Sequence, residues 1–314
     1  MTVSFDPCQS YVGRFRYSGL ALTNLEYLMP HDIHTSVMLV ELNVSQWTAR
    51  KMDKRVASAV AQSNHVGEDV GRYYKSLLDP AIIKQITSQV NETRKQYYKL
   101  TLPWADDGPR VLPSAMYFDF MADMQACRLQ FEALVNGFLA DYPYHREQAK
   151  LFLGSLFQDS DYPEPATLAA KFGFHLKVTP LPHAQDFRCE IGGEEVDKIR
   201  AQIEAETRAT MQATVKSAFD RIMVVASQYA DRLGETDGVF RDSMVDKARE
   251  LVDIMPKLNF TNDPELTRLT AVVNEKLAAH DPAVLRTNMT TRTQAAAAAK
   301  NVVSDIENFF GGNQ

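Results

Sequence analysis

The sequence predicts a mostly α-helical fold of the α+β class: a multi-helix bundle with one long helix and a small β-hairpin. Apolar residues keep the three-or-four-residue spacing of an amphipathic helix from residue 194 to residue 233, with no glycine or proline. Residues 174–191 contain two β-prone runs around a proline-containing turn. We expect three regions: an N-terminal segment (1–36), a helical core domain (37–233), and C-terminal helices with an alanine-rich tail (234–314).

The composition is that of a globular protein and argues against several classes of function. The chain has 314 residues, of which 45% are hydrophobic and 24% charged, a net charge of −6 and a pI near 5.7. An acidic protein is a poor candidate for binding nucleic acid over its whole surface, although a local basic patch stays possible. Cys8, Cys127 and Cys189 are far apart and odd in number, which disfavours a disulfide framework and fits a reducing cytoplasm. We expect no secretion signal and no membrane span.

The N-terminal third is expected to begin with short strands and continue with helices. The runs "YVGRFRYSGLAL" and "HTSVMLVELNV" are extended in character. Ser45 then predicts the cap of a helix, whose apolar stripe consists of Ala49, Met52, Val56 and Val60. A shorter helix is expected over residues 67–78.

Further helices follow from capping residues and apolar spacing. Asp79 as cap and Pro80 at the first helical position predict a helix with Ile83, Ile86, Val90 and Tyr97 on its apolar face. Ser114 is expected to cap a strongly apolar helix that reaches about Tyr142, with a separate helix over residues 144–157.

The second half predicts the hairpin, the long helix and the C-terminal helices. Residues 174–179 and 185–191 are expected to pair with each other, because a proline-rich turn separates them. The helix over residues 194–233 would be a rod of about 60 Å. Two amphipathic helices and an alanine-rich helix follow it, and the five alanines of the last favour helix while burying little.

The segment "TLPWADDGPRVLP" (101–113) is either a metal or catalytic loop or a stiff corner. Adjacent Asp106 and Asp107 could hold Mg²⁺, but such sites usually need further carboxylates or a phosphate. An Asp-Asp-Gly-Pro sequence is also typical of a turn. We favour a structural corner in which Trp104 packs on neighbouring helices and Arg110 pairs with Asp106 or Asp107.

No motif in the sequence indicates catalysis, a metal or a cofactor. The chain lacks a phosphate-binding loop, a dinucleotide fingerprint, a nucleophile elbow and a His-Glu-x-x-His zinc motif, and it offers only a His-x-x-His pair at His31 and His34. We therefore expect no catalytic residues, no metal and no cofactor, and a protein that is not an enzyme.

A basic stretch with a tryptophan is the main candidate binding surface. The segment places the cations Arg50, Lys51, Lys54 and Arg55 around Trp47, and on the predicted helix Trp47 would share a face with Arg50, Lys51 and Lys54. Such a face could bind phosphates, with the indole stacking on bases, or could be an ordinary solvated helix face.

The long helix suggests a second surface. A rod of this length must cover its apolar row either with the C-terminal helices or with another copy of the chain. We favour self-association, as in a coiled coil or other homo-oligomer, because the tail after Thr287 is polar and rich in alanine. The row consists of Met211, Val215, Phe219, Ile222 and Tyr229.

An ordered set of short segments resembles an uncharacterised protein family of tailed bacteriophages and bacterial mobile elements. The segments, between residues 38 and 205, are "LNVSQWTARKMDKRV", "TLPWADDGPRVLP", "DYP", "KFGF" and "PLPHAQDFRCEIGGEEVDKIRAQIE". The resemblance implies the cytoplasm of a bacterial host and genes nearby for a MoxR-type AAA+ ATPase and a von Willebrand-type protein. The resemblance assigns no catalytic residues to this chain. Two hypotheses follow: a non-enzymatic assembly or adaptor protein that self-associates through long helices beside such an ATPase, or a nucleic-acid-binding protein of phage DNA metabolism that uses the Trp47 helix.

Overall fold

A computed structural model describes residues 33–67, 69–105, 107–234 and 240–311. It confirms the mostly α-helical α+β class. The chain divides into two compact units, which we call the sheet unit (His34–Asp186) and the bundle unit (the described residues from Phe187 onward). The division after Asp186 differs from the boundaries expected at 36 and 233, because the long helix packs with the C-terminal helices. Of the proposed N-terminal strands, only the second falls on described residues.

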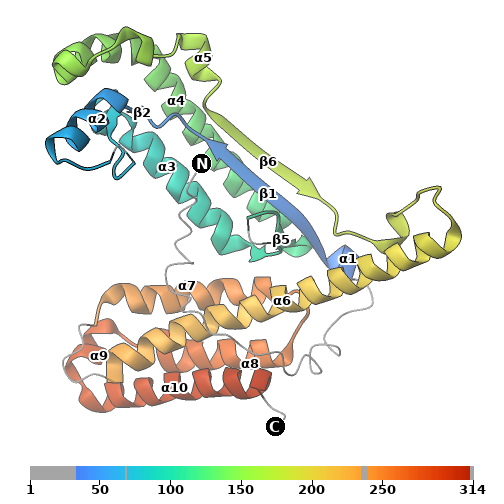
Figure 1. Cartoon of the computed structure of the whole chain (residues 1–314). Coiled ribbons are helices and arrows are strands. Elements are labelled where there is room, and N and C mark those ends of the chain that lie inside the picture. The colour runs from blue at the N-terminus through green and yellow to red at the C-terminus, as the bar shows by residue number, and fades with distance from the viewer. Residues whose placement is uncertain (1–32, 68, 106, 235–239, 312–314) are drawn as a thin grey trace. The chain divides into compact units, whose positions relative to one another are not determined.

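The sheet unit is built around a four-stranded antiparallel sheet in the order β4-β5-β1-β6 (Figure 1). The short helix α1 (Ile33–Ser36) leads into the central strand β1, and the strands are β1 (Val37–Ser45), β4 (Leu102–Pro103), β5 (Arg110–Pro113) and β6 (Gly173–Thr179). Val37 pairs with Pro113 on one side of β1, and Ser45 pairs with Gly173 on the other.

The predicted hairpin within 174–191 is wrong. β6 pairs along its whole length with β1, which lies more than 120 residues earlier in the chain, and residues 185–191 form no strand. They contain part of the 3₁₀ turn η6 (Ala184–Asp186). The physical reason is that β1 offers β6 a long apolar partner strand, and such pairing between distant segments outweighs the local pattern of two β-prone runs around a turn.

Two long helices, α3 (Pro80–Leu100) and α4 (Tyr117–Leu153), pack against each other and bury the sheet's apolar side chains. As predicted, Asp79 caps α3, where its carboxylate accepts the N–H of Ala81 at 2.9 Å. Ser114 instead begins the 3₁₀ turn η3 (Ser114–Met116) that precedes α4. The expected break near residue 143 is wrong, because α4 continues through Pro143. A proline costs a helix one N–H donor and some steric strain, and the packed apolar residues on both sides of it compensate.

The expected start of a helix at Ser45 is also wrong, although its second half is present as a helix, and the helix expected over 67–78 is absent from the described residues of that stretch. β1 runs through Ser45, and the chain then turns at Ala49, which has a positive φ of 47°. The two-stranded sheet of β2 (Arg50–Met52) and β3 (Tyr74–Ser76) follows, with α2 (Lys54–Ser63) between its strands. Pairing with β3 holds residues 50–52 extended, so the helix starts only after Asp53.

Short turns complete the sheet unit after α4. They are η4 (Gly154–Leu156), η5 (Asp159–Asp161) and α5 (Pro165–Ala169). Their side chains join a core that contains Trp47, Leu77, Tyr142 and Tyr162.

The bundle unit consists of the predicted long helix and the helices that follow it (Figure 1). They are α6 (Gly193–Gly234), α7 (Asp242–Leu258), α8 (Pro264–Val273) with a π-helical turn (Asn274–Ala278), α9 (Pro282–Thr287) and α10 (Met289–Gly311). None of the helices in the described part of the chain is both long and apolar enough to cross a membrane.

The apolar row of α6 is covered within the chain, so it is not the self-association surface that we expected. All five side chains of the row are at most 2% exposed. Phe219 lies 5.2 Å from Phe309 and 5.1 Å from Phe310 of α10, measured between ring centroids. The expectation that the alanine-rich tail buries little is wrong as well, because Ala295, Ala296 and Ala299 are buried. Small side chains let two helix backbones approach closely.

Candidate partner-binding surface

The predicted binding tryptophan is part of the core and does not lie on a surface helix. Trp47 is 9% exposed and follows β1, with its ring 6.0 Å from Tyr142 and 6.2 Å from Phe138 between centroids. The contact with Tyr142 is edge-to-face, a favourable geometry for aromatic rings. Trp47 therefore shares no helical face with the four cations, and its indole is not available to stack on a base.

One of these cations, Lys51, instead belongs to a largely buried group of charges, which we call the ion cluster: Lys51, Asp53, Lys75 and Asp161. Lys75 Nζ lies 2.7 Å from Asp161 Oδ2 and 3.3 Å from Asp53 Oδ2, and all three side chains are at most 5% exposed. Lys75 also donates to the carbonyl of Leu156 at 2.7 Å. Lys51 Nζ approaches the other oxygen of Asp161, at 2.7 Å, from the solvent side.

The pKa values of the cluster favour its charged state. Burial alone would raise the pKa of Asp53 and of Asp161, but hydrogen bonds and the neighbouring cations outweigh burial, so both pKa values lie below the usual range. Burial alone would lower the pKa of Lys75, but the two carboxylates raise it above its usual value. Lys75 is therefore an ammonium ion at neutral pH, which is a positioning group and not a nucleophile.

The ion cluster joins three regions of the chain: the start of α2, strand β3, and the neighbouring turns η4 and η5. Asp53 caps α2 through the N–H groups of Arg55 and Val56, at 3.1 and 3.3 Å, while its other oxygen faces Lys75 of β3. Asp161 ends η5, and the Leu156 carbonyl belongs to η4. Buried charges that satisfy one another fix the register of the parts that carry them. The cluster thus sets how α2 lies relative to η4 and η5.

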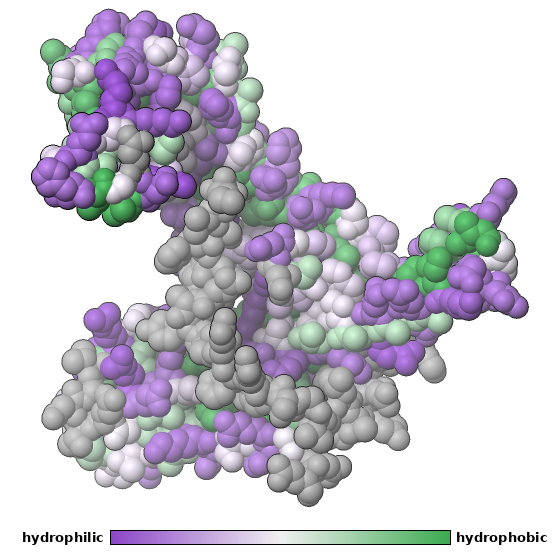
Figure 2. Space-filling view, viewed as in Figure 1, coloured by the Kyte–Doolittle hydropathy of each residue, from purple (hydrophilic) through white to green (hydrophobic). Residues whose placement is uncertain are grey.

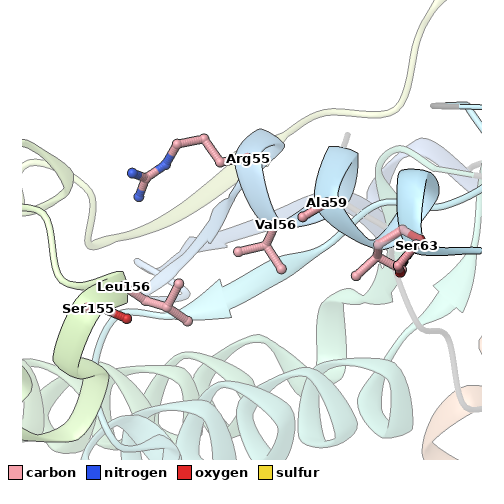
Figure 3. A pocket seen from close by; sticks show the side chains of 7 residues that line it. Arg55, Val56, Ala59, Ser63, Ser155 and Leu156 are labelled. Atoms are coloured by element: carbon pink, nitrogen blue, oxygen red, sulfur yellow. Dashed lines mark hydrogen bonds between the residues drawn. The ribbon is translucent and has the colours of Figure 1, made fainter.

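A groove lies between α2 and η4. Val56, Ala59, Val60 and Ser63 line it from α2, and Ser155 and Leu156 line it from η4, with Arg55 at one end. Figure 3 shows Val56 pointing toward the Leu156 side of the groove and Arg55 reaching outward from the start of α2. The groove is open to solvent, and Val60 is 51% exposed. Only Ala61 of α2 is buried, so the apolar side of this amphipathic helix is largely uncovered.

More apolar side chains extend this surface. Leu151 and Phe152, in the last turn of α4 before η4, are 82% and 53% exposed, and Met52 and Tyr74 are exposed on the β2–β3 pair. In Figure 2, apolar side chains in green reach the surface among hydrophilic ones at the end of the sheet unit that carries α2. Gathered exposed apolar side chains are typical of interaction sites, whereas isolated ones are not.

Four of the five residues predicted to bind a partner provide the charge beside the groove. Arg50 and Lys54 are exposed, the Arg55 side chain is 67% exposed, and Lys51 is half-exposed above Asp161. Asp53 is the only acidic residue among residues 50–55, and it is buried in the ion cluster. The accessible charge of the segment is therefore positive, and we call the four cations the basic rim.

In its described residues, the stretch 101–113 forms the β4–β5 hairpin. Thr101 ends α3, and Arg110 donates to its hydroxyl at 2.8 Å and to its carbonyl at 3.1 Å. The Arg110 guanidinium also lies 4.8 Å from the ring centre of Tyr98, and Trp104 is half-buried. Asp107 is exposed, and Asp106 lies outside the described residues, so its proposed pairing with Arg110 stays a prediction.

The sequence analysis did not identify Asp53, Lys75 or Asp161 as members of a site. One signal was available for Asp53, because an aspartate before a helical segment is a preferred cap. No local pattern marks Lys75 or Asp161, since their meeting depends on segments 86 residues apart. In the part of the chain that the structure describes, no three His, Cys, Asp or Glu side chains gather in a way that could hold a metal ion.

Comparison with known proteins identifies no relative of this chain. No family model, no curated protein and no solved structure matches the chain.

Proposed function

We propose that the protein is a non-enzymatic assembly or adaptor protein whose groove between α2 and η4 binds a helix of a protein partner. The observation that carries this proposal is the open apolar side of α2, held in place by the buried ion cluster and flanked by the basic rim. A helix that lays an apolar stripe in a groove is a common mode of recognition. The rim adds a preference for acidic residues beside that stripe.

The alternative, nucleic-acid binding through Trp47, loses its main support because the indole is buried. The basic rim alone could still touch phosphates, but the surface beside it is apolar and not a stacking platform. A MoxR-type AAA+ ATPase or a von Willebrand-type protein as the partner is an expectation from the sequence resemblance, and the groove chemistry is compatible with an acidic helix from either.

Affinity purification from the native cell tests the proposal. Val60→Glu places a charge in the groove, whereas Val224→Glu adds the same charge at a comparably exposed valine of α6. We expect a protein that the wild type and Val224→Glu retain and that Val60→Glu loses, with retention that declines as salt rises. Identical retention by all three proteins would contradict the proposal, and retention of nucleic acid instead of protein would favour the alternative.

A further inference from the structure

The long helix α6 consists of two parts with different surroundings. None of its residues before Met211 is buried, whereas eleven residues from Met211 onward are. We call residues 193–210 the arm. The arm continues the packed part of α6 into a stretch where no side chain is buried, so a partner that covered its apolar side chains would stabilise it.

The arm has the chemistry that the groove would select. Val196, Ile199 and Ile203 lie on one side of it at helical spacing and are half-buried. Between residues 194 and 208 the arm carries five acidic and three basic residues. Each base lies near an acid one turn away, as in the pairs Lys198–Glu195 at 2.6 Å and Arg208–Glu204 at 3.1 Å. The surplus charge of the arm is therefore negative, opposite to that of the basic rim.

From this complementarity we infer that the groove binds the arm of a second copy of this chain. The inference rests on the proposed function and names the partner. The apolar stripe of the arm spans about 10 Å, which suits the short apolar side of α2 and Leu156. Helix against helix would cover Val56 and Val60, while acids of the arm would face Lys54 and Arg55.

The direction of β6 favours a second copy over the chain's own arm. Gly173 begins β6 beside Ser45, near the groove, and Thr179 ends it beside Leu39, at the other end of the sheet. A seven-residue strand covers roughly 20 Å, so the chain leaves the sheet unit far from the groove. Beyond Asp186, the carbonyl of Phe187 accepts a hydrogen bond from Arg200 at 3.2 Å, which shortens the free chain that leads into the arm.

Reciprocal charge reversal tests the inference by sedimentation equilibrium of the full chain. The wild type should have a mass above 35.4 kDa at tens of micromolar, and the mass should fall as salt rises. The arm variant Glu204→Lys/Glu206→Lys and the rim variant Lys54→Glu/Arg55→Glu should each be folded monomers. The control, Asp253→Lys/Glu307→Lys, changes exposed charges of α7 and α10 and should keep the wild-type mass.

Mixing the arm and rim variants should restore association, because the basic arm of one fits the acidic rim of the other. A monomeric wild type, association that both variants keep, or a mixture that stays monomeric would each overturn the inference. If the wild type is monomeric while Val60→Glu still loses a different protein in the purification experiment, the inference fails and the proposed function stands. If the wild type is monomeric and Val60→Glu loses no protein in the purification experiment, both the inference and the proposed function fail.

Discussion

Lys75 and Lys51 bind the same carboxylate at the same distance but differ in burial. Substituting each one tests whether the buried part of the ion cluster stabilises the fold. Lys75 and Lys51 both place Nζ 2.7 Å from an oxygen of Asp161, but their side chains are 2% and 47% exposed. Lys75→Met keeps the length of the side chain and removes its charge. It leaves the carboxylates of Asp53 and Asp161 facing each other without the ammonium between them.

The expected loss of stability follows from that burial. Removing one partner of a buried ion pair costs about 3–5 kcal/mol, a large part of the 5–15 kcal/mol by which domains are stable. An exposed pair contributes about 0–1 kcal/mol, so Lys51→Met should change little. With a urea dependence of about 2 kcal/mol per molar, the unfolding midpoint should fall by about 2 M for Lys75→Met and by less than about 0.5 M for Lys51→Met.

Tryptophan fluorescence during urea unfolding is the assay, because both tryptophans of the chain, Trp47 and Trp104, belong to the sheet unit. The signal therefore reports the unit that contains the ion cluster and is insensitive to separate unfolding of the bundle unit. Equal midpoint shifts for the two lysine variants, or a shift below about 0.5 M for Lys75→Met, would refute the reasoning.

Three further predictions concern both units. Folding lowers the pKa values of Asp53 and Asp161, so the stability that these carboxylates contribute is complete at neutral pH and is lost below about pH 4. The urea midpoint of the wild type, detected by fluorescence, should therefore fall below that pH. A midpoint unchanged down to pH 3 would contradict this prediction. Arg292 donates to two carbonyls at the end of α6, and Arg292→Met should destabilise the bundle unit by about 1–3 kcal/mol in calorimetry, whereas no change would show that the cap is dispensable. Ala299→Leu overfills a buried position of α10 and should lower the free energy of unfolding by about 1–3 kcal/mol, measured by the circular dichroism of the helices. The control Ala297→Leu changes an exposed position of the same helix and should have almost no effect. Equal effects of the two substitutions would contradict the packing.

The sequence predicted well those elements whose signals are local. Asp79 and Pro80 mark the start of α3, and the uninterrupted spacing of α6 gave its length to within a residue at each end. Both depend on neighbours within one or two turns of the same helix. The mostly α-helical class followed from the same kind of pattern.

The errors have a common cause in pairing between distant segments. Apolar residues after Ser45 fit a helical spacing, but pairing of residues 50–52 with β3 keeps them extended. β6 likewise pairs with the distant strand β1, and the apolar row of α6 is buried within the chain, with the alanine-rich helix α10 among the helices that pack on it. Local propensity is a weak prior against such tertiary contacts.

The candidate surface was predicted in part. The basic segment is evident from the sequence, and the binding role of its cations stays a prediction, whereas the surface role predicted for Trp47 is wrong because the residue is buried. The ion cluster could not be foreseen, since Asp161 meets Lys75 only after the chain has passed through α3 and α4. The charges of these side chains follow from the sequence alone, whereas their burial depends on the folded structure.

Photo-crosslinking from the groove tests the central claim most directly. A benzophenone amino acid at position 60 would be placed in a full chain of ordinary isotopes and mixed with a ¹⁵N-labelled copy that lacks it. The account predicts crosslinked peptides that join position 60 to residues 193–210 of the labelled copy, and their loss when that copy carries Glu204→Lys/Glu206→Lys. Crosslinks confined to the same chain, or to segments of the labelled copy outside the arm, would contradict it.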